Sequence, residues 1–422
     1  MARKVILVKP PERSRFNFGT FSLGVLAAAV EDIAEVRLLD ASRMEIAEVV
    51  RRCVQWQADW IGITTMAPSS LPPVSQLVRG LRNALPDGRI VIGGHGASMF
   101  PRPTLEAGAD AVVVGEGETT FRRLLSEGIS DNLPGLALLL NGRLKTTPPP
   151  PLIHPLDHLN PPARHLMPPP EDGVHLMETS RGCPHQCGFC ETTRFYGRRW
   201  RHHSPVRVAA EVRRLVRDYN AWIVEISDDN FAASRRRVLE ICKVLRQQEQ
   251  LPALFILSAR ADDLIANPGM LPAMAAANML RISVGVETLD PEVAGRSGKQ
   301  IPLDTYRQLF DRMRALNMFS VASFIVGLPG ETAQIRRTTL DLAEAAGPDA
   351  AQFIPFQPFP DLPLSQGYED LTPARDAAEA SEMFTREYYR RPQPFDRLAS
   401  AAAGNGIRAT LARGTLEKYG LL

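Results

Sequence analysis

Two stretches of this 422-residue chain alternate short apolar runs with helical patterns, and a proline-rich stretch lies between them. The first stretch contains five apolar runs, among them "KVILVKP", "DWIGITTM" and "RIVIGGHG", with helix-like segments between them. The runs are rich in Val, Ile and Leu without polar alternation, which is typical of parallel strands buried on both faces. Residues 1–140 are therefore predicted to form a doubly wound, Rossmann-like α/β domain, which binds ligands at the carboxyl ends of its strands.

The prolines gather in residues 141–172, where their density disfavours helices and central strands and predicts an extended linker. Six further apolar runs, separated by helical patterns, occupy residues 173–365. Six βα units predict a partial (β/α)6 barrel of the TIM type, with functional groups at the carboxyl ends of its strands. Residues 366–422 read as a short helical tail, and its aromatic residues are expected to pack: Phe384, Tyr388 and Tyr389.

The charge and cysteine content exclude several classes of protein. The net charge of +2, from 49 basic and 47 acidic residues, gives no strong attraction to nucleic acid. No apolar run reaches the roughly 18 residues that span a bilayer. Five cysteines, three of them clustered, do not make a disulfide framework, and Cys53 and Cys242 are expected to be small buried hydrophobes. A cytoplasmic protein without a nucleic-acid partner or a membrane span is expected.

The three clustered cysteines stand in the loop after the first strand of the predicted barrel. Cys183, Cys187 and Cys190 form a Cys-x3-Cys-x2-Cys run in "TSRGCPHQCGFCETT". Three such thiolates can hold three irons of a [4Fe–4S] cube and leave the fourth iron open to a small molecule. A structural zinc site is the alternative, since histidines that could complete a set of four ligands lie nearby: His185, His202 and His203.

This run, with the aromatic Phe189 before its last cysteine, resembles the radical S-adenosylmethionine (radical SAM) family. The resemblance implies that SAM binds the open iron through its amino and carboxylate groups. It also implies that one electron from the cluster cleaves SAM to a 5′-deoxyadenosyl radical. It also implies that SAM contacts follow at successive strand ends: Asp228 and Asp229, Ser258 and Arg260, Glu287, and Gly327 and Gly330. Adjacent acids also form caps and turns, so Asp228 and Asp229 are assigned by position. After the cluster loop, Ser204 is expected to cap a helix that starts at Pro205.

The N-terminal domain resembles the cobalamin-binding domain of one large radical SAM subfamily. The resemblance lies in loops after the strands, and it implies these cofactor contacts: Thr64, Thr65 and Ser69, then Gly93, Gly94 and His95, then Gly115, Glu116 and Gly117. One departure concerns the Asp-x-His-x-x-Gly motif, whose histidine replaces the lower axial base of cobalamin. Here "LLDASRME" has Asp40 and Ser42 but no histidine. The lower face of a bound cobalamin is then open, hydrated or met by another side chain; a degenerate domain is the alternative.

Together these resemblances imply a cobalamin-dependent radical SAM enzyme that methylates an unactivated carbon through methylcobalamin and a 5′-deoxyadenosyl radical. The implied cofactors are a [4Fe–4S] cluster, SAM and cobalamin, with an external electron donor of the flavodoxin or ferredoxin type. The substrate, a small molecule or a peptide, is not indicated. Three alternatives stay open: a cobalamin-binding radical SAM enzyme that cyclises, contracts a ring or rearranges, an enzyme that has lost cobalamin, and a non-enzymatic cobalamin or redox sensor.

Overall fold

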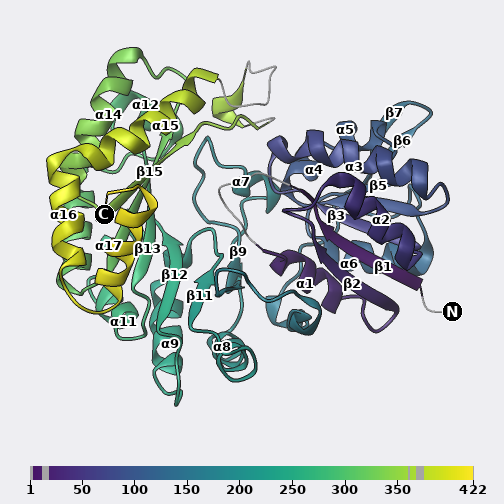
Figure 1. Ribbon diagram of the computed structural model, residues 1–422, viewed down its shortest axis with the longest axis horizontal. Coiled ribbons are helices and arrows are strands. Elements are labelled where there is room, and N and C mark those ends of the chain that lie inside the picture. Colours follow the sequence, from purple (N-terminus) through teal and green to yellow (C-terminus); the bar gives the residue numbers. More distant parts are fainter. Residues whose placement is uncertain (1–2, 12–18, 360–361, 367–374, 422) are drawn as a thin grey trace. The chain divides into compact units, whose positions relative to one another are not determined.

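The computed structural model describes residues 3–11, 19–359, 362–366 and 375–421. The chain divides into two compact units, Met1–Glu171 and Asp172–Leu422 (Figure 1). Within the described residues, no helix combines the length and the hydrophobicity needed to cross a membrane.

A seven-stranded sheet forms the centre of the first unit, with the strand order β2-β1-β3-β4-β5-β6-β7. Its strands are β1 (Arg3–Lys9), β2 (Ala34–Asp40), β3 (Trp60–Thr64), β4 (Arg89–Gly93), β5 (Ala111–Val113), β6 (Leu136–Leu140) and β7 (Arg143–Thr146). Strands β1 to β5 pair in parallel, and their order is that of a doubly wound sheet, as the sequence predicts. The antiparallel strands β6 and β7 were not predicted, and β7 lies in the stretch predicted to be linker.

Helices cover both faces of this sheet. They are α1 (Phe21–Ala28), α2 (Ile46–Trp56), α3 (Leu71–Ala84), α4 (His95–Met99), α5 (Arg102–Glu106) and α6 (Gly117–Glu127), with short 3-10 turns at η1 (Pro68–Ser70), η2 (Leu156–His158) and η3 (Arg164–Leu166). Alternate residues of β1 enter two separate cores: Ile6 packs with Cys53 and Leu77, whereas Leu7 packs with Leu23 and Phe121. A strand buried on both faces explains why the apolar runs lack polar alternation.

Six parallel strands form the sheet of the second unit, in the order β15-β14-β13-β12-β11-β8. They are β8 (Val174–Met177), β11 (Ile223–Ile226), β12 (Leu254–Ala259), β13 (Arg281–Glu287), β14 (Phe319–Val326) and β15 (Ala350–Pro355). All six were predicted, and their consecutive order is that of a partial barrel. Two short strands, β9 (Ser180–Arg181) and β10 (Arg201–His202), pair on either side of the cysteine run.

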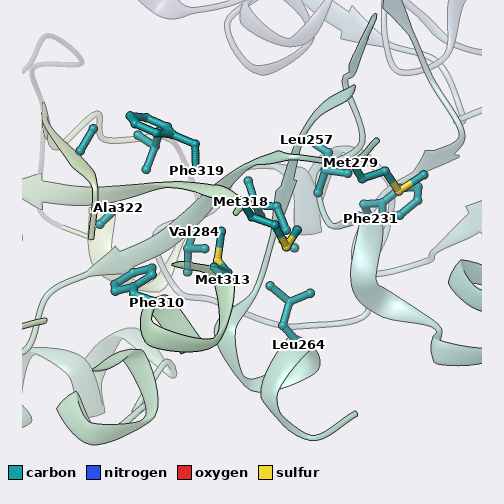
Figure 2. Packing of buried hydrophobic residues seen from close by; sticks show 14 of the residues in the cluster. Phe231, Leu257, Leu264, Met279, Val284, Phe310, Met313, Met318, Phe319 and Ala322 are labelled. Carbon is teal, nitrogen blue, oxygen red and sulfur yellow. The ribbon is translucent and has the colours of Figure 1, made fainter. Parts of the chain in front are cut away.

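Eight described helices precede the C-terminal helices of the second unit, and those that enter the barrel core pack on one face of its strands. They are α7 (Thr192–Phe195), α8 (Pro205–Tyr219), α9 (Arg235–Leu245), α10 (Ala261–Ile265), α11 (Met270–Ala275), α12 (Pro291–Ser297), α13 (Leu303–Ala315) and α14 (Ala333–Ala346), with 3-10 turns at η4 (Phe231–Ala233) and η5 (Pro363–Ser365). Ser204 caps α8, since its hydroxyl accepts a hydrogen bond from the backbone N–H of Arg207, as predicted. Figure 2 shows Val284 of β13 in this core together with Phe310 and Met313 of α13.

Three C-terminal helices complete the second unit: α15 (Arg375–Arg390), α16 (Pro392–Ala402) and α17 (Ile407–Lys418). Helix α15 lies against β15, the edge strand of the barrel sheet (Figure 1). The hydroxyl of Tyr389 donates to the carbonyl of Ala351 at 2.8 Å and accepts from its N–H at 3.1 Å. Phe384, Tyr388 and Tyr389 are all buried in the barrel core, which confirms the prediction that they pack. The helices therefore cover a sheet edge that would otherwise expose unpaired backbone groups.

Candidate active site

The three cysteines of the Cys-x3-Cys-x2-Cys run lie in the loop between β9 and α7, which we call the cysteine loop (residues 182–192). All three are free and partly buried. Burial raises the pKa of the Cys190 thiol to about 12 and raises that of Cys183 as well. Thiols of this kind ionise when a metal replaces the proton, because the positive metal compensates the desolvated thiolate.

The arrangement of the loop fits an iron–sulfur cube better than a single zinc ion. Across the described residues, no group of three His, Cys, Asp or Glu side chains converges to hold one metal ion. His185 instead pairs with Asp263 at 2.9 Å, and His202 bonds the backbone carbonyl of His203. A zinc site gathers all its ligands around one centre, whereas a cube takes each thiolate at a different iron and keeps the sulfurs apart. The donor set of three thiols therefore fits a [4Fe–4S] cluster with one open iron.

Asp229, which follows β11, accepts hydrogen bonds from both ends of the cysteine loop. Its Oδ2 accepts a hydrogen bond from the N–H of Gly182 at 3.0 Å, and its Oδ1 accepts one from the hydroxyl of Thr192 at 2.8 Å. Gly182 precedes the first cysteine and Thr192 follows the last one. One carboxylate thus fixes the span of chain that carries all three thiols.

Asp228 binds the segment that leads into the loop. Its carboxylate accepts hydrogen bonds from the N–H groups and the hydroxyls of Thr179 and Ser180, all four at 2.5–2.9 Å. Asp228 is fully surrounded by protein, and Arg237 lies 4.0 Å away. Sequence position alone places Asp228 and Asp229 beside the SAM amino group; their described bonds support the cysteine loop, and contact with SAM stays a prediction.

Arg260, at the end of β12, reaches the cysteine loop directly. Its Nη1 donates to Sγ of Cys187 at 3.1 Å, while its Nε and Nη2 donate to the carboxylate of Asp262 at 3.0 and 2.8 Å. Burial acts to lower the pKa of Arg260, but the bonds and charge of Asp262, together with the charges of Cys187 and Asp263, outweigh it and raise this pKa above its usual range. A fixed positive charge therefore stands next to the second cysteine. Ser258, two residues earlier, is exposed on the same strand.

Glu287 ends β13 in a left-handed conformation, with φ at +69°, where the pairing with β14 shifts register. Its Oε1 forms an ion pair with Nζ of Lys299 at 2.9 Å, and both side chains are largely buried. Lys299 was not predicted, because nothing in "GRSGKQ" distinguishes a buried lysine from an exposed one. Nearby, Tyr306 is fully buried, and its hydroxyl donates to the carbonyl of Gly285 at 3.4 Å. Burial raises the pKa of Tyr306, and the charge of Glu287 adds to this effect.

The turn after β14 contains Gly327 and Gly330, both at positive φ. Glu331 closes this turn, since its Oε2 accepts hydrogen bonds from the N–H groups of Gly327 and Leu328. A side chain at Gly330 would collide with the guanidinium of Arg296, which donates to the carbonyl of Pro329. The turn is therefore shaped by contacts that only glycine allows.

The tip of the cysteine loop docks on this turn. Phe189 packs in a small apolar cluster, whose buried members are Val293, Leu328, Phe356 and Leu364. The N–H of Gly188 donates to the carbonyl of Ser297 at 2.8 Å, and the carbonyl of Gly188 accepts from the N–H of Leu364 at 3.2 Å. The loop is thus anchored by residues that follow β11, β12, β13 and β15.

In the first unit, the carboxyl ends of β4 and β5 leave bare backbone. A Cβ atom at Gly93 or at Gly115 would meet nothing within 4 Å, and Gly115 has a φ of +83°. Thr65 supports the turn after β4: its hydroxyl donates to the carbonyl of Gly93 at 3.0 Å and accepts from the N–H of Ala97 at 2.7 Å. The open backbone at two neighbouring strand ends is the kind of surface on which a large flat cofactor such as cobalamin can lie, so the residues present fit that group.

The other predicted cobalamin contacts of this unit divide into three kinds. Glu116 is buried, and its Oε2 accepts a hydrogen bond from the N–H of Ile153, so it holds the proline-rich segment. Gly94 has a φ of +90° and packs tightly on Thr65, while Gly117 begins α6. The remaining three have accessible side chains at the ends of β3 and β4: Thr64, Ser69 and His95.

A buried lysine, Lys9, lies beside Asp40, the residue that takes the place of the aspartate in the Asp-x-His-x-x-Gly motif. Asp40 ends β2 and accepts hydrogen bonds from the N–H and the hydroxyl of Ser42 at 3.0 and 2.5 Å. Lys9, at the end of β1, places Nζ 3.9 Å from Asp40 and is 4% exposed. The burial of this lysine was not predictable, because its partner Asp40 is distant in the chain.

Comparison with known proteins matches both units. The model of the radical SAM superfamily matches residues 177–343, and that of the B12 binding domain matches residues 14–125. The chain is 30% identical over 379 residues to an uncharacterized methyltransferase, PH0819, of Pyrococcus horikoshii, covering 85% of this chain and 81% of that protein. It is 26% identical to the anaerobic magnesium-protoporphyrin IX monomethyl ester cyclase of Rubrivivax gelatinosus, of which it covers 63%.

Among solved structures, the radical SAM methyltransferase TsrM of Kitasatospora setae shares this fold. With tryptophan and a SAM analog bound, it superposes with a TM-score of 0.75 at 18% identity, over 92% of this chain and 83% of TsrM. Another TsrM structure, with a TM-score of 0.72 at 19% identity, holds cobalamin and a [4Fe–4S] cluster. The match covers most of this chain and therefore includes both of its units.

Proposed function

Since the chain belongs to the cobalamin-dependent radical SAM family, we propose that it uses SAM and cobalamin to methylate an unactivated carbon of its substrate. The observation that carries this proposal is the cysteine loop: three free thiols held at the carboxyl end of a barrel, in a chain that also has a B12-binding unit. When bound, the cluster supplies the electron that cleaves SAM to a 5′-deoxyadenosyl radical, and cobalamin carries the methyl group.

The residues of the barrel divide this work. Cys183, Cys187 and Cys190 hold three irons, and Asp229 keeps their loop closed. Residues at the ends of successive strands and in the loop tip contact SAM: Phe189, Ser258, Arg260, Glu287, Gly327 and Gly330. Asp228 positions the entry to the loop and so acts on SAM through the cluster.

The first unit holds cobalamin at the carboxyl ends of its strands. The bare backbone of Gly93 and Gly115 contacts the corrin, with Gly94 and Gly117 shaping the turns around it. Polar side chains near the ring or its tail come from Thr64, Ser69 and His95. Thr65 and Glu116 stabilise the neighbouring backbone through hydrogen bonds. Ser42 stands where the Asp-x-His-x-x-Gly motif has its histidine, so this position would offer a bound cobalamin no imidazole.

An external donor of the flavodoxin or ferredoxin type supplies the electrons, and the protein works in the cytoplasm, where its thiols stay reduced. The second candidate function is a cobalamin-binding radical SAM reaction without methyl transfer. One observation favours it: the 26% identical relative from Rubrivivax gelatinosus is a cyclase.

The test uses protein purified without oxygen, reconstituted with iron, sulfide and hydroxocobalamin, and given a strong reductant and SAM. We expect S-adenosylhomocysteine and 5′-deoxyadenosine to form together, because methyl transfer consumes one SAM and radical formation another. Formation of 5′-deoxyadenosine alone would support the second candidate instead. Cys187→Ala should abolish 5′-deoxyadenosine, while Cys53→Ala, outside the cysteine loop, serves as the matched control.

A further inference from the structure

The barrel strands carry a band of polar side chains on the face opposite the helices. Four residues form this polar band, and they come from β12, β13, β14 and β15 respectively: Ser258, Ser283, Ser323 and Gln352. Ser258 is paired with Ser283 in register, and Ser323 is paired with Gln352. Nε2 of Gln352 donates to Oγ of Ser323 at 2.6 Å. The band therefore crosses four neighbouring strands.

The alternation of the strands shows which face the band occupies. Leu257, Val284 and Phe324, the neighbours of three band residues, are at most 1% exposed and belong to the core shared with the helices. Ser258 is exposed, and the other three band residues are partly exposed. Successive side chains of a strand point to opposite faces, so the band faces away from the helix-covered core.

The band lies directly below the residues that reach the cofactor site. Ser258 precedes Arg260 by two residues, and Ser283 precedes Glu287 by four. At a rise of about 3.3 Å per residue, the separations along the strands are about 7 and 13 Å. A molecule that contacts the band can therefore extend to the carboxyl ends of the strands, where such barrels carry out their chemistry.

Two charged residues on the same face lie lower in the barrel. Burial raises the pKa of Glu225, an effect that Arg281 opposes, and burial lowers the pKa of Arg281, an effect that Glu225 opposes. Asp172 and Tyr389 also act on this pair. Neither Glu225 nor Arg281 forms a side-chain hydrogen bond to any residue that the structure describes. A hydrocarbon placed over them would remove their remaining hydration and offer no hydrogen bond in return, which is costly for charged groups.

We propose that the substrate is a water-soluble compound and not a lipid, and that its hydrogen-bonding groups contact Ser283, Ser323 and Gln352. Ser258, at the β12 end of the band, is the member proposed to contact SAM. The hydroxyls and the amide of the band match donors and acceptors on such a compound, and the charged pair below disfavours an apolar chain. This inference rests on the proposed methyl transfer, since it names the class of molecule that accepts the methyl group.

The experiment gives the reconstituted holoenzyme SAM labelled in its methyl group, a reductant and an extract of cells that carry the gene. The products are then divided between water and chloroform, with S-adenosylhomocysteine measured in the same reactions. We expect label in an aqueous product other than SAM, methionine and methylcobalamin, formed only when extract is present and absent with boiled enzyme. Label in a chloroform-soluble product formed from the extract would overturn the inference. So would the absence of such an aqueous product while S-adenosylhomocysteine forms in excess over cobalamin, since the excess requires a methyl acceptor. An absence of S-adenosylhomocysteine would instead refute the proposed methyl transfer itself.

Variants of the band connect the result to these residues. In Ser283→Ala and Gln352→Leu, the amount of aqueous extract that gives half-maximal labelling should rise about five- to tenfold, as expected for the loss of one hydrogen bond. Ser400→Ala and Gln308→Leu, at exposed positions, are matched controls and should leave it unchanged. Cluster content, measured as iron and sulfide per chain, should be the same in all four variants. Unchanged half-saturation in both band variants would contradict the assignment.

Discussion

Arg260 donates a hydrogen bond from Nη1 to Sγ of Cys187 across 3.1 Å, while Asp262 holds the other side of the same guanidinium. The charge of Arg260 is therefore fixed in place beside a cluster ligand. Hydrogen bonds to the ligand sulfurs are among the influences that set the potential of an iron–sulfur cluster. We therefore expect Arg260 to influence the reduction potential of the cluster, in addition to the contact with SAM that is proposed for it.

Arg260→Gln should lower the reduction potential of the cluster, because a positive charge beside the thiolate favours the reduced, more negative state. The reduction potential of the cluster in Arg260→Lys should lie between those in Arg260→Gln and in the parent protein. Redox titration followed by electron paramagnetic resonance, carried out without SAM, measures this directly. Arg246→Gln at the exposed end of α9 is the control, and an unchanged potential in Arg260→Gln would contradict the assignment.

Asp229→Ala should reduce the cluster content after reconstitution by at least about half. The substitution removes the one carboxylate that accepts hydrogen bonds from both ends of the cysteine loop. Iron and sulfide analysis per chain is the measurement. The control is Asp218→Ala, which removes an exposed carboxylate that pairs only with its neighbour Arg217 among the described contacts. A fully loaded Asp229→Ala variant would show that the loop holds its shape without this support.

Gly93→Ala should weaken cobalamin binding without destabilising the apoprotein. The added Cβ meets no atom of the chain within 4 Å, so it would touch only a molecule lying on the strand ends. Equilibrium dialysis of hydroxocobalamin and a thermal midpoint on the apoprotein separate the two effects. Gly269→Ala, which likewise meets no atom but lies in the barrel unit, should bind cobalamin normally. Equal affinity of both variants for hydroxocobalamin would show that cobalamin does not lie against the end of β4.

Lys299→Met should destabilise the protein by about 3–5 kcal/mol, because it leaves Glu287 as an unpaired buried carboxylate. The double variant Lys299→Met with Glu287→Gln should recover part of this loss, since the remaining side chains are neutral. Denaturant unfolding of the two variants and the parent protein gives the comparison. If the double variant is no more stable than Lys299→Met, the two side chains are not energetically paired.

Tyr389→Phe should cost about 1–3 kcal/mol of unfolding free energy, because the N–H and the carbonyl of Ala351 lose a shared partner in a buried place. The matched control is Tyr219→Phe, whose hydroxyl forms no hydrogen bond to a described residue. A Tyr389→Phe variant as stable as the control would mean that water replaces the phenol at the edge of β15.

The strands and the cysteine loop were predictable because each carries a local signal. Buried parallel strands require continuous apolar runs, and cluster ligands on one loop require close spacing, so both patterns are legible in the sequence. Strand β7 lacked such a signal, because each of its side chains is exposed and its strand character comes from its pairing with β6 alone.

The partners of charged residues were not predictable. Lys299 meets Glu287 across 12 positions, and Lys9 meets Asp40 across 31, so neither pair is visible before the strands are assembled. For the same reason, the sequence located Asp228 and Asp229 at a strand end but not the bonds they form. Those bonds run to residues 37 to 49 positions earlier in the chain.

The edge of β15 has a consequence for synthesis on the ribosome. Helix α15, which supplies Tyr389 and Ser381 to that edge, is translated after the whole six-stranded sheet. Until it emerges, the nascent barrel presents a row of unpaired backbone groups that can pair with another chain. Premature termination between β15 and α15 should therefore give a product that aggregates, even though every cluster ligand is already present.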